Sequence, residues 1–375
     1  MFERIKRLAR ALGWGSWRWL NLEAKLARAV RQTAGGALTQ YGDLLADLRQ
    51  VAVSPEGDIL CSREVHEAAI ASPPTNPVDP SLSRPWQERC VPREEKSEVA
   101  REGLTIAIPR CEWLNYYHSV VDLYNCYFLT QFFGEEPLNT RILFLDHHDV
   151  SPFEELWTTH FKEVLTPKHF ERTLGFERLV VGPINYESPF GPGLGPRPPY
   201  FEDFSRLFQN LTETPDQLTF VSRSLAKQRK LANEKELLEA LKERLPQAKI
   251  ECVLFENLTP LEQISLMSKT KLLVGMHGAG LTHSVFLPSQ SGLFEIFPGL
   301  LHAFRVNFTN IAIWRRLSYR RHIDWRRLTE PAEGDNYLEI ARVADKVAAH
   351  WNSMSSETRT QDQSQPSSSV FRKLL

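Results

Sequence analysis

The chain has 375 residues, of which 42% are hydrophobic and 24% are charged, and its formal net charge is −1. This length allows two domains that each bury a core, and the composition excludes a largely disordered chain or one dominated by membrane spans. The balanced charge gives no general electrostatic reason to bind nucleic acid. The five cysteines are scattered without a C-x-x-C pair, which argues against a disulfide framework or a zinc cluster and fits a reducing compartment.

The N-terminal segment, residues 1–20, places apolar side chains at helical spacing among Lys and Arg and carries a tryptophan cluster. A basic amphipathic helix of this kind suits an anionic membrane surface, and packing on the protein body explains the pattern equally well. Charges interrupt the apolar residues, so the segment does not have the pattern of a signal peptide. No apolar run in the sequence approaches the length of a transmembrane span. We therefore expect a cytoplasmic protein, with peripheral membrane contact through residues 1–20 as the alternative.

The first third of the chain reads as an extension followed by a connection. Helical spacing continues through residues 21–50, so residues 1–70 are expected to form an N-terminal helical extension. Residues 71–103 are rich in proline and polar side chains, which is typical of an extended connection.

Strands and helices then alternate twice along the chain, once in residues 104–200 and again in residues 201–334. Prolines and glycines crowd residues 188–200, which marks the seam between the two sets. A C-terminal helix is expected at 335–352, and a polar disordered tail at 353–375. Two successive sets of this kind predict an α/β protein with two Rossmann-like halves and a ligand between them.

Residues 271–298 are the most informative stretch. The apolar run at 271–275 predicts a buried strand, and it ends in Met276-His277-Gly278-Ala279-Gly280. Small residues there permit a tight turn and a close approach of the backbone to a ligand. The spacing is neither the dinucleotide fingerprint nor a P-loop, so glycines that serve packing alone remain the alternative.

A short helix is expected at 281–287 and a second strand at 293–297, which carries Glu295 near its exit. Backbone N–H groups at the start of a helix favour phosphate, and a carboxylate at the end of the next parallel strand can hold ribose hydroxyls. The whole pattern favours the nucleotide-binding half of a sugar-nucleotide enzyme.

The helix expected at 113–133 carries a candidate acid–base pair near its start. His118 and Asp122 are four residues apart and therefore share one helical face, where they could take a proton from an acceptor hydroxyl. The alternative is a histidine that bonds locally and an aspartate that caps or forms a salt bridge. The aromatic residues of the same helix are expected to be core.

Arg223 follows the strand expected at 217–222, where its guanidinium can donate two hydrogen bonds to a diphosphate. Arg229 is a candidate second cation for the same diphosphate. A solvated basic loop is the alternative. The run from Asp146 to Asp149 contains two histidines, but adjacent side chains cannot all face one ion, so no metal site is expected.

Three segments, taken in order, resemble glycosyltransferase family 61. They are NYYHSVVDLYN at 115–125, FVSRS with RKLANEKEL within 220–237, and GMHGAGLTHSVFLP with FEIFP within 275–298. The resemblance covers residues 104–351. It implies a GT-B fold, in which two Rossmann-like domains face each other across a cleft, with the first domain on the acceptor side and the second binding the nucleotide sugar.

The resemblance also implies an inverting transfer of a sugar, a pentose or an N-acetylhexosamine, from a nucleotide sugar that is often UDP-linked. The acceptor would be a hydroxyl of a glycan, glycolipid or protein, and no cofactor or metal would be required. Asp122 and His118 would lie on the acceptor side, with Asp122 as the base. The donor residues that it implies are Arg223 for the phosphate, Glu295 for the ribose, and His277, Gly278, Ala279, Gly280 and Thr282 along the diphosphate and sugar.

Two rival classes remain open. One is a binding or scaffolding protein that keeps the GT-B fold without catalysis. The other is a different sugar-nucleotide enzyme such as an epimerase, which requires a dinucleotide fingerprint and a Tyr-x-x-x-Lys pair that the sequence does not supply.

Overall fold

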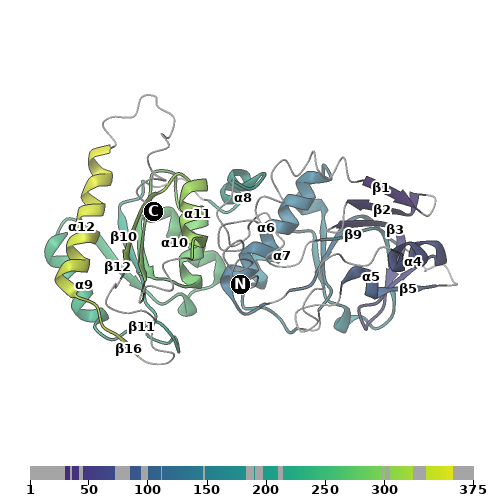
Figure 1. The fold of residues 1–375 in the computed structure, drawn as a ribbon, viewed down its shortest axis with the longest axis horizontal. Coiled ribbons are helices and arrows are strands. Elements are labelled where there is room, and N and C mark those ends of the chain that lie inside the picture. Colours follow the sequence, from purple (N-terminus) through teal and green to yellow (C-terminus); the bar gives the residue numbers. More distant parts are fainter. Residues whose placement is uncertain are drawn as a thin grey trace, which may run out of the picture.

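A computed structural model describes residues 30–357, except 34–35, 42–44, 72–84, 94–99, 111, 147, 183–189, 191–196, 210–213, 298, 300–304 and 324–334. The described strands form a nine-stranded sheet, a five-stranded sheet and a two-stranded sheet. Helices pack on the two large sheets, which lie at opposite ends of the molecule in Figure 1. The expected α/β class is confirmed. Residues 1–20, with the proposed membrane helix, lie outside the described residues.

The larger sheet is mixed and has the order β1-β2-β3-β9-β6-β7-β8, with β4 and β5 branching from β3. Strands β9, β6, β7 and β8 are parallel, whereas β1, β2, β3 and β9 pair antiparallel. The strands are β1 (Val30–Thr33), β2 (Leu38–Tyr41), β3 (Leu45–Val53), β4 (Ile59–Cys61), β5 (Cys90–Pro92), β6 (Ala100–Ile108), β7 (Arg141–Phe144), β8 (Glu163–Leu165) and β9 (Leu174–Val181). The helices of this part are α4 (Arg63–Ile70), α5 (Trp86–Arg89), α6 (Tyr116–Phe132), η2 (Pro137–Asn139), α7 (Glu154–His160), η3 (Pro167–His169) and α8 (Phe201–Leu207).

The expected helical extension at 1–70 is wrong for most of its described part. Residues 30–61 supply strands β1 to β4, and only α4 is helical. The connection expected at 71–103 likewise contains α5, β5 and the start of β6. The helical spacing was misleading because β3 buries every residue except Arg49 and Gln50, so its buried residues do not alternate along the strand. A strand covered on both faces cannot be separated from a helix by periodicity alone.

A buried ion pair ties β3 to β9. The Arg178 guanidinium donates from Nε to Asp47 Oδ1 at 3.1 Å and from Nη2 to Asp47 Oδ2 at 2.9 Å. Asp47 is 4% exposed, and Arg178 also lies 4.5 Å from the centroid of the Phe133 ring. The N-terminal strands are therefore joined to the sheet by charge as well as by the backbone ladder.

We expect Asp47→Ala to lower the free energy of unfolding by about 3 kcal/mol, because Arg178 would keep its charge without its partner. Urea unfolding of the full chain measures this loss. The control is Arg63→Ala, since Arg63 pairs with Glu67 on the exposed face of α4 and should contribute less than about 1 kcal/mol. Equal losses from the two variants would contradict the prediction.

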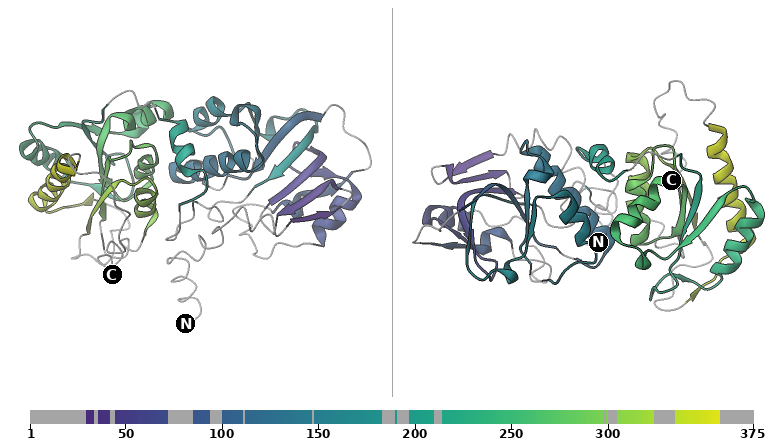
Figure 2. Two further views of the ribbon diagram at one scale, coloured as in Figure 1. Left: turned by 90° about the horizontal axis from the view of Figure 1, so that it is seen from above. Right: turned by 180° about the vertical axis from the view of Figure 1, so that it is seen from behind.

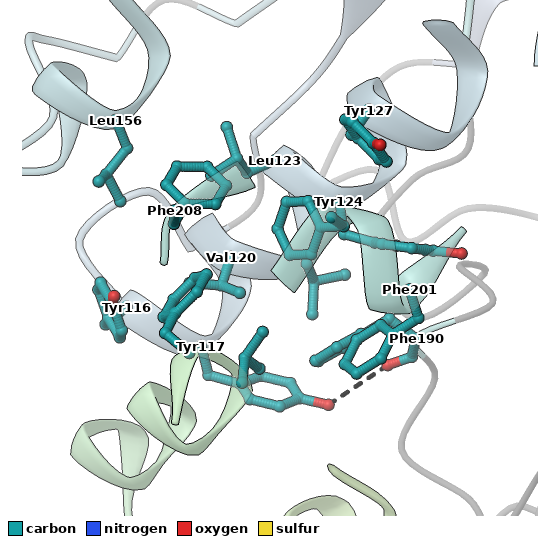
Figure 3. Packing of buried hydrophobic residues seen from close by; sticks show 14 of the residues in the cluster. Tyr116, Tyr117, Val120, Leu123, Tyr124, Tyr127, Leu156, Phe190, Phe201 and Phe208 are labelled. Atoms are coloured by element: carbon teal, nitrogen blue, oxygen red, sulfur yellow. Dashed lines mark hydrogen bonds between the residues drawn. The ribbon is translucent and has the colours of Figure 1, made fainter. Parts of the chain in front are cut away.

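Helix α6 is the centre of the first half. Asn115 caps it by accepting a hydrogen bond from Tyr117 N at 3.1 Å, and residues 116–130 are all buried. Figure 3 shows its aromatic side chains packed with Phe190, Phe201 and Phe208, and Tyr117 donates from its hydroxyl to Phe190 O at 3.4 Å. The expectation that these aromatic residues are core is confirmed.

The five-stranded sheet is entirely parallel, in the order β12-β10-β13-β14-β15. Its strands are β10 (Gln217–Val221), β12 (Lys249–Val253), β13 (Thr270–Met276), β14 (Gly292–Phe297) and β15 (Ser318–Ile323), and β11 (Lys230–Leu231) pairs apart with β16 (Asp335–Asn336). Its helices are α9 (Glu234–Arg244), η5 (Phe255–Asn257), α10 (Pro260–Lys269), η6 (Ala279–Phe286), α11 (Asn307–Trp314) and α12 (Ile340–Glu357). From β10 the chain adds β12 on one side and then β13, β14 and β15 on the other. The order of the strands thus reverses between β10 and β13, which makes this pair the topological switch point.

Most elements expected in the second half are confirmed within a few residues, and the expected helix after the glycine turn is the 3-10 helix η6. Helix α11 and strand β15 were not expected. The C-terminal helix runs to Glu357, so the expected tail begins too early, and residues 358–375 lie outside the described residues.

The two halves share one hydrophobic core. A single buried cluster contains α6 side chains such as Tyr117 together with Val221, Leu281 and Phe308 from the second half. At the junction the Tyr116 ring stacks on His283 of η6 at 4.1 Å, and Phe255 stacks on His283 at 3.9 Å. Both views in Figure 2 place α6 beside the green elements of the second half, so the N-terminal end of α6 meets the turn after β13.

Candidate active site

The glycine turn and Arg223 meet at the switch point. Val221 of β10 is in register with Gly275 of β13, so both strands end at the same edge of the sheet. A Cβ atom added at Gly278 would overlap the Arg223 guanidinium, with Cζ only 3.2 Å away. Arg223 is held in place by donating from Nη2 to Gln228 O at 3.1 Å. A cation therefore lies against a bare backbone turn at the edge where open α/β sheets bind their ligands.

The glycines of the turn do different work. A Cβ at Gly275 would lie 3.1 Å from atoms of Val221 and Leu281, and one at Gly280 would lie 2.9 Å from Val221. These two glycines permit close packing of the turn on β10, as the packing alternative expected. Gly278 instead makes room for Arg223, which is the arrangement that a ligand site needs.

We expect Gly278→Ala to weaken nucleotide-sugar binding by about tenfold, because the new methyl group must displace the Arg223 guanidinium. Calorimetry on the variant measures this. The double variant with Arg223→Ala should bind no more weakly than Arg223→Ala alone, since both changes act on one contact. Additive losses would show that the methyl group acts elsewhere.

The remaining predicted donor residues lie on the same edge or just behind it. Ala279 begins η6 and is half-buried, whereas the Thr282 side chain is fully buried and its hydroxyl has no hydrogen-bond partner among the described residues. Arg229 is half-buried in the loop that follows β10 and has a left-handed backbone with φ 57°. The structure brings these residues to the switch-point side of the sheet, and their contact with a donor stays a prediction.

His277 and Glu295 form a buried pair. His277 Nδ1 lies 2.5 Å from Glu295 Oε1, and Tyr319 donates from its hydroxyl to Glu295 Oε2 at 2.6 Å. Glu295 is 1% exposed, so both of its oxygens have protein partners inside the sheet. Tyr319 was missed because β15 was not expected. The run SYRRHI carries three consecutive polar residues and so lacks the alternation that would have signalled a strand.

On the acceptor side, Asp122 of α6 lies within electrostatic reach of Arg110 and Asp146, which follow β6 and β7. It is 4% exposed. Burial raises the pKa of Asp122 well above its usual range, the Asp146 carboxylate raises that pKa further, and the Arg110 guanidinium lowers it. A carboxyl group in such surroundings is poised for proton transfer nearer neutral pH than an exposed one.

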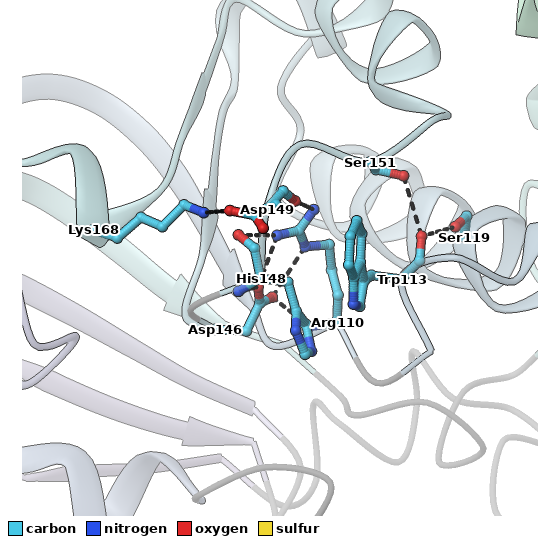
Figure 4. Close-up of polar contacts among 8 residues, drawn as sticks. All are labelled: Arg110, Trp113, Ser119, Asp146, His148, Asp149, Ser151 and Lys168. Carbon is cyan, nitrogen blue, oxygen red and sulfur yellow. Dashed lines mark hydrogen bonds and ion pairs between the residues drawn. The ribbon is translucent and has the colours of Figure 1, made fainter.

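Arg110 and Asp146 form a forked ion pair beside it, which the sequence analysis did not identify. Arg110 donates from Nε to Asp146 Oδ2 at 3.0 Å and from Nη2 to Asp146 Oδ1 at 2.7 Å. Figure 4 shows this pair with the His148 ring stacked on Trp113. Arg110 follows β6 and Asp146 follows β7, so two neighbouring parallel strands that end at one edge were the signal that could have found the pair.

His118 begins α6 beside this group. Its Nε2 lies 3.3 Å from Glu112 Oε2, and its ring meets the edge of Tyr117. His118 is 4% exposed, so a local hydrogen bond explains its present contacts. Its part in proton transfer stays a prediction.

The other charged motifs have protein partners. Asp149 pairs with Lys168, and Arg315 pairs with Glu202 at 2.7 Å and donates to Leu287 O at 2.8 Å. His147 and the basic run Trp325-Arg326-Arg327 lie outside the described residues. Among the residues that the structure describes, no cluster of His, Cys, Asp and Glu is arranged to hold a metal ion, and no helix is long and apolar enough to cross a membrane.

Comparison with known proteins identifies a family that matches the part of the chain containing this site. The family model described as Glycosyltransferase 61 matches residues 109–294, which contain α6, Arg223 and the glycine turn. The chain belongs to glycosyltransferase family 61. The resemblance drawn from the three sequence segments is thereby confirmed.

Relatives of this family 61 chain include plant and animal enzymes. A beta-1,2-xylosyltransferase of Oryza sativa subsp. japonica is 25% identical over 268 residues, which are 58% of this chain and 49% of that protein. A beta-1,2-xylosyltransferase of Arabidopsis thaliana is 24% identical over 278 residues, 58% of this chain and 51% of that protein. An EGF domain-specific O-linked N-acetylglucosamine transferase of Drosophila melanogaster is 40% identical over 81 residues, 22% of this chain and 15% of that protein. The chain thus spans about half the length of the xylosyltransferases it matches.

Proposed function

We propose that this family 61 chain is an inverting glycosyltransferase of the GT-B type. It moves a sugar, a pentose or an N-acetylhexosamine, from a nucleotide sugar to a hydroxyl of a glycan, glycolipid or protein. The observation that carries the proposal is the Arg223 guanidinium lying against the Gly278 backbone at the switch point. The names of the relatives, which transfer xylose or N-acetylglucosamine, support the sugar class.

In the proposed reaction the acceptor oxygen attacks the anomeric carbon as the bond from that carbon to the donor phosphate breaks. Asp122 takes the acceptor proton, with His118 beside it at the start of α6. Arg223 and the N–H groups of the turn stabilise the negative charge that develops on the leaving nucleotide diphosphate. A fixed guanidinium supplies the positive charge that a metal ion would otherwise bring, so we propose a metal-independent transfer with UDP as the donor nucleotide.

The two halves have matching tasks in this proposal. Residues 104–200, with the N-terminal strands joined to them, hold the acceptor, and residues 201–334 hold the donor. The support is that α6, which carries Asp122 and His118, packs on η6 directly after the donor turn, where Tyr116 stacks on His283.

The test is a calorimetric panel of UDP, GDP, CMP and their common sugars, with and without Mn²⁺. Selective binding of one nucleotide and its sugar without metal supports the proposal and names the donor. Binding that appears only with Mn²⁺ contradicts the metal-independent mechanism. Binding of no member contradicts the transferase and favours a scaffold that keeps the fold.

A further inference from the structure

Three polar side chains from neighbouring strands form a buried hydrogen-bonded row on one face of the second sheet. Glu295 of β14 is in register with Gly275 of β13, and Tyr319 of β15 is in register with Leu293 of β14. Because side chains alternate along a strand, Tyr319, Glu295 and His277 all lie on the face to which Gly275 belongs. That face carries η6 and α11 and faces the first half of the molecule.

The hydrogen bonds among these three side chains indicate which of their atoms carry protons. Tyr319 donates to one oxygen of Glu295, and the other oxygen lies 2.5 Å from His277 Nδ1. A carboxylate accepts hydrogen bonds, so Nδ1 carries a proton and donates it to Glu295. The nitrogen with which His277 can address any further group is therefore Nε2.

The ring itself is clamped. Phe297 stacks on His277 at 5.0 Å between ring centroids, and Phe308 meets it edge-on at 5.3 Å. The backbone N–H of His277 donates to Ile296 O at 2.8 Å, which holds the residue on the edge of the sheet directly before Gly278. An imidazole with a fixed ring plane and a fixed Nδ1 proton is thus placed next to the Arg223 contact.

Burial argues against the role that the family resemblance implied for Glu295. A carboxylate that holds ribose hydroxyls must present an oxygen to the ligand, whereas Glu295 is 1% exposed and uses one oxygen for each protein partner. Opening this arrangement would leave the Tyr319 hydroxyl or the His277 ring with a buried unpaired group, which is unfavourable.

We propose that Glu295 and Tyr319 are positioning residues that hold His277, so that its Nε2–H bonds an oxygen of the leaving diphosphate while its Nδ1–H bonds Glu295. The inference rests on the proposed transferase function. When the ring carries both protons, its charge is balanced by Glu295, and Nε2 donates beside Arg223. Negative charge developing on the diphosphate then meets two fixed donors of hydrogen bonds.

The test follows the ring nitrogens of His277 directly. The full chain is labelled with ¹⁵N-histidine, and the His277 signals are those that disappear in His277→Gln. We expect the neutral ring to carry its proton on Nδ1 in the wild type and in Tyr319→Phe, which keeps the accepting carboxylate, and the Nε2–H form to appear in Glu295→Gln. Tyr337→Phe is the matched control, because Tyr337 is 60% exposed. A wild-type ring with its neutral proton on Nε2, or a Glu295→Gln ring that stays as in the wild type, would overturn the proposal.

Ligand measurements separate positioning from ribose contact. Addition of UDP should protonate Nε2 of wild-type His277. Glu295→Gln should lower kcat by about 10²- to 10⁴-fold, the range expected when a catalytic histidine loses its tautomer, with a small change in donor KM. If Glu295 held the ribose, the variant would weaken UDP but spare 2′,3′-dideoxy-UDP, and the positioning role would be wrong. Tyr319→Phe keeps the carboxylate and should lower kcat less than Glu295→Gln. If Glu295→Gln does not fold, the wild-type tautomer and its response to UDP still test the proposal.

Failure of the proposed function looks different from failure of this inference. If no nucleotide binds, the transferase proposal fails and the diphosphate role with it, while the ligand-free ring still reports whether Glu295 sets its tautomer. If UDP binds and turnover occurs but Nε2 does not respond, the inference alone is wrong.

Discussion

Arg223→Ala is expected to lower kcat/KM for the donor by about 10²- to 10³-fold, the loss typical of removing one preorganised donor from a developing negative charge. The reason is the position of the guanidinium, which packs on the bare backbone of Gly278 where β10 and β13 end. Calorimetry with UDP and hydrolysis of the UDP-sugar identified by the panel measure the effect.

Two further variants sharpen the Arg223 experiment. Arg223→Lys keeps the charge but loses the planar fork, so it should fall between alanine and the wild type. Arg63→Ala removes an exposed arginine from α4 and should leave binding unchanged. Wild-type affinity for UDP in Arg223→Ala would remove the central support for the donor site.

Asp122→Asn is expected to lower the rate of transfer by about 10²- to 10⁴-fold while donor affinity stays within error, because an amide cannot take the acceptor proton. Transfer to an acceptor found on a glycan array, or donor hydrolysis, gives the rate. The same variant should be more stable than the wild type at neutral pH. Wild-type turnover with the fold intact would contradict the assignment of Asp122 as the base.

The stability effect follows from the sign of the pKa shift. Burial raises the pKa of Asp122 in the folded chain above its value in the unfolded chain, so the folded state holds this proton more tightly. Stability from this group is therefore present at low pH and is lost as pH rises through the folded pKa. The midpoint of thermal unfolding should be higher for Asp122→Asn at neutral pH, and the difference should vanish in acid.

The rate should depend on pH in the opposite sense, because only the ionised carboxylate can act as a base. Wild-type kcat/KM should rise with pH through the raised pKa of Asp122. Asp146→Asn removes a like charge and releases Arg110, and both changes lower the pKa of Asp122, so this rise should move to lower pH. A rise that stays in place would show that another group controls it. Thermal unfolding of the variant checks that the fold survives.

Local sequence determined the elements that form the site. The strands expected at 217–222 and 271–275 and the helix expected at 113–133 were each signalled by neighbouring residues, and the structure confirms them within a few residues. Because parallel strands end at one edge, the sequence also indicated that Arg223 and the glycine turn lie on the same side of the sheet. The family followed from the same three segments.

Tertiary structure decided which side chains meet. The switch point depends on the order β12-β10-β13-β14-β15, which no local pattern encodes, and that order places Arg223 on Gly278. The strands of residues 30–61 were misread as helical because a strand buried on both faces lacks alternation. The surroundings of Glu295 depend on Tyr319 from a strand 24 residues further along the chain. Sequence periodicity indicates which face of an element is buried. Partners that are distant in sequence depend on how the elements pack, and this packing places His277 and Tyr319 against the Glu295 carboxylate.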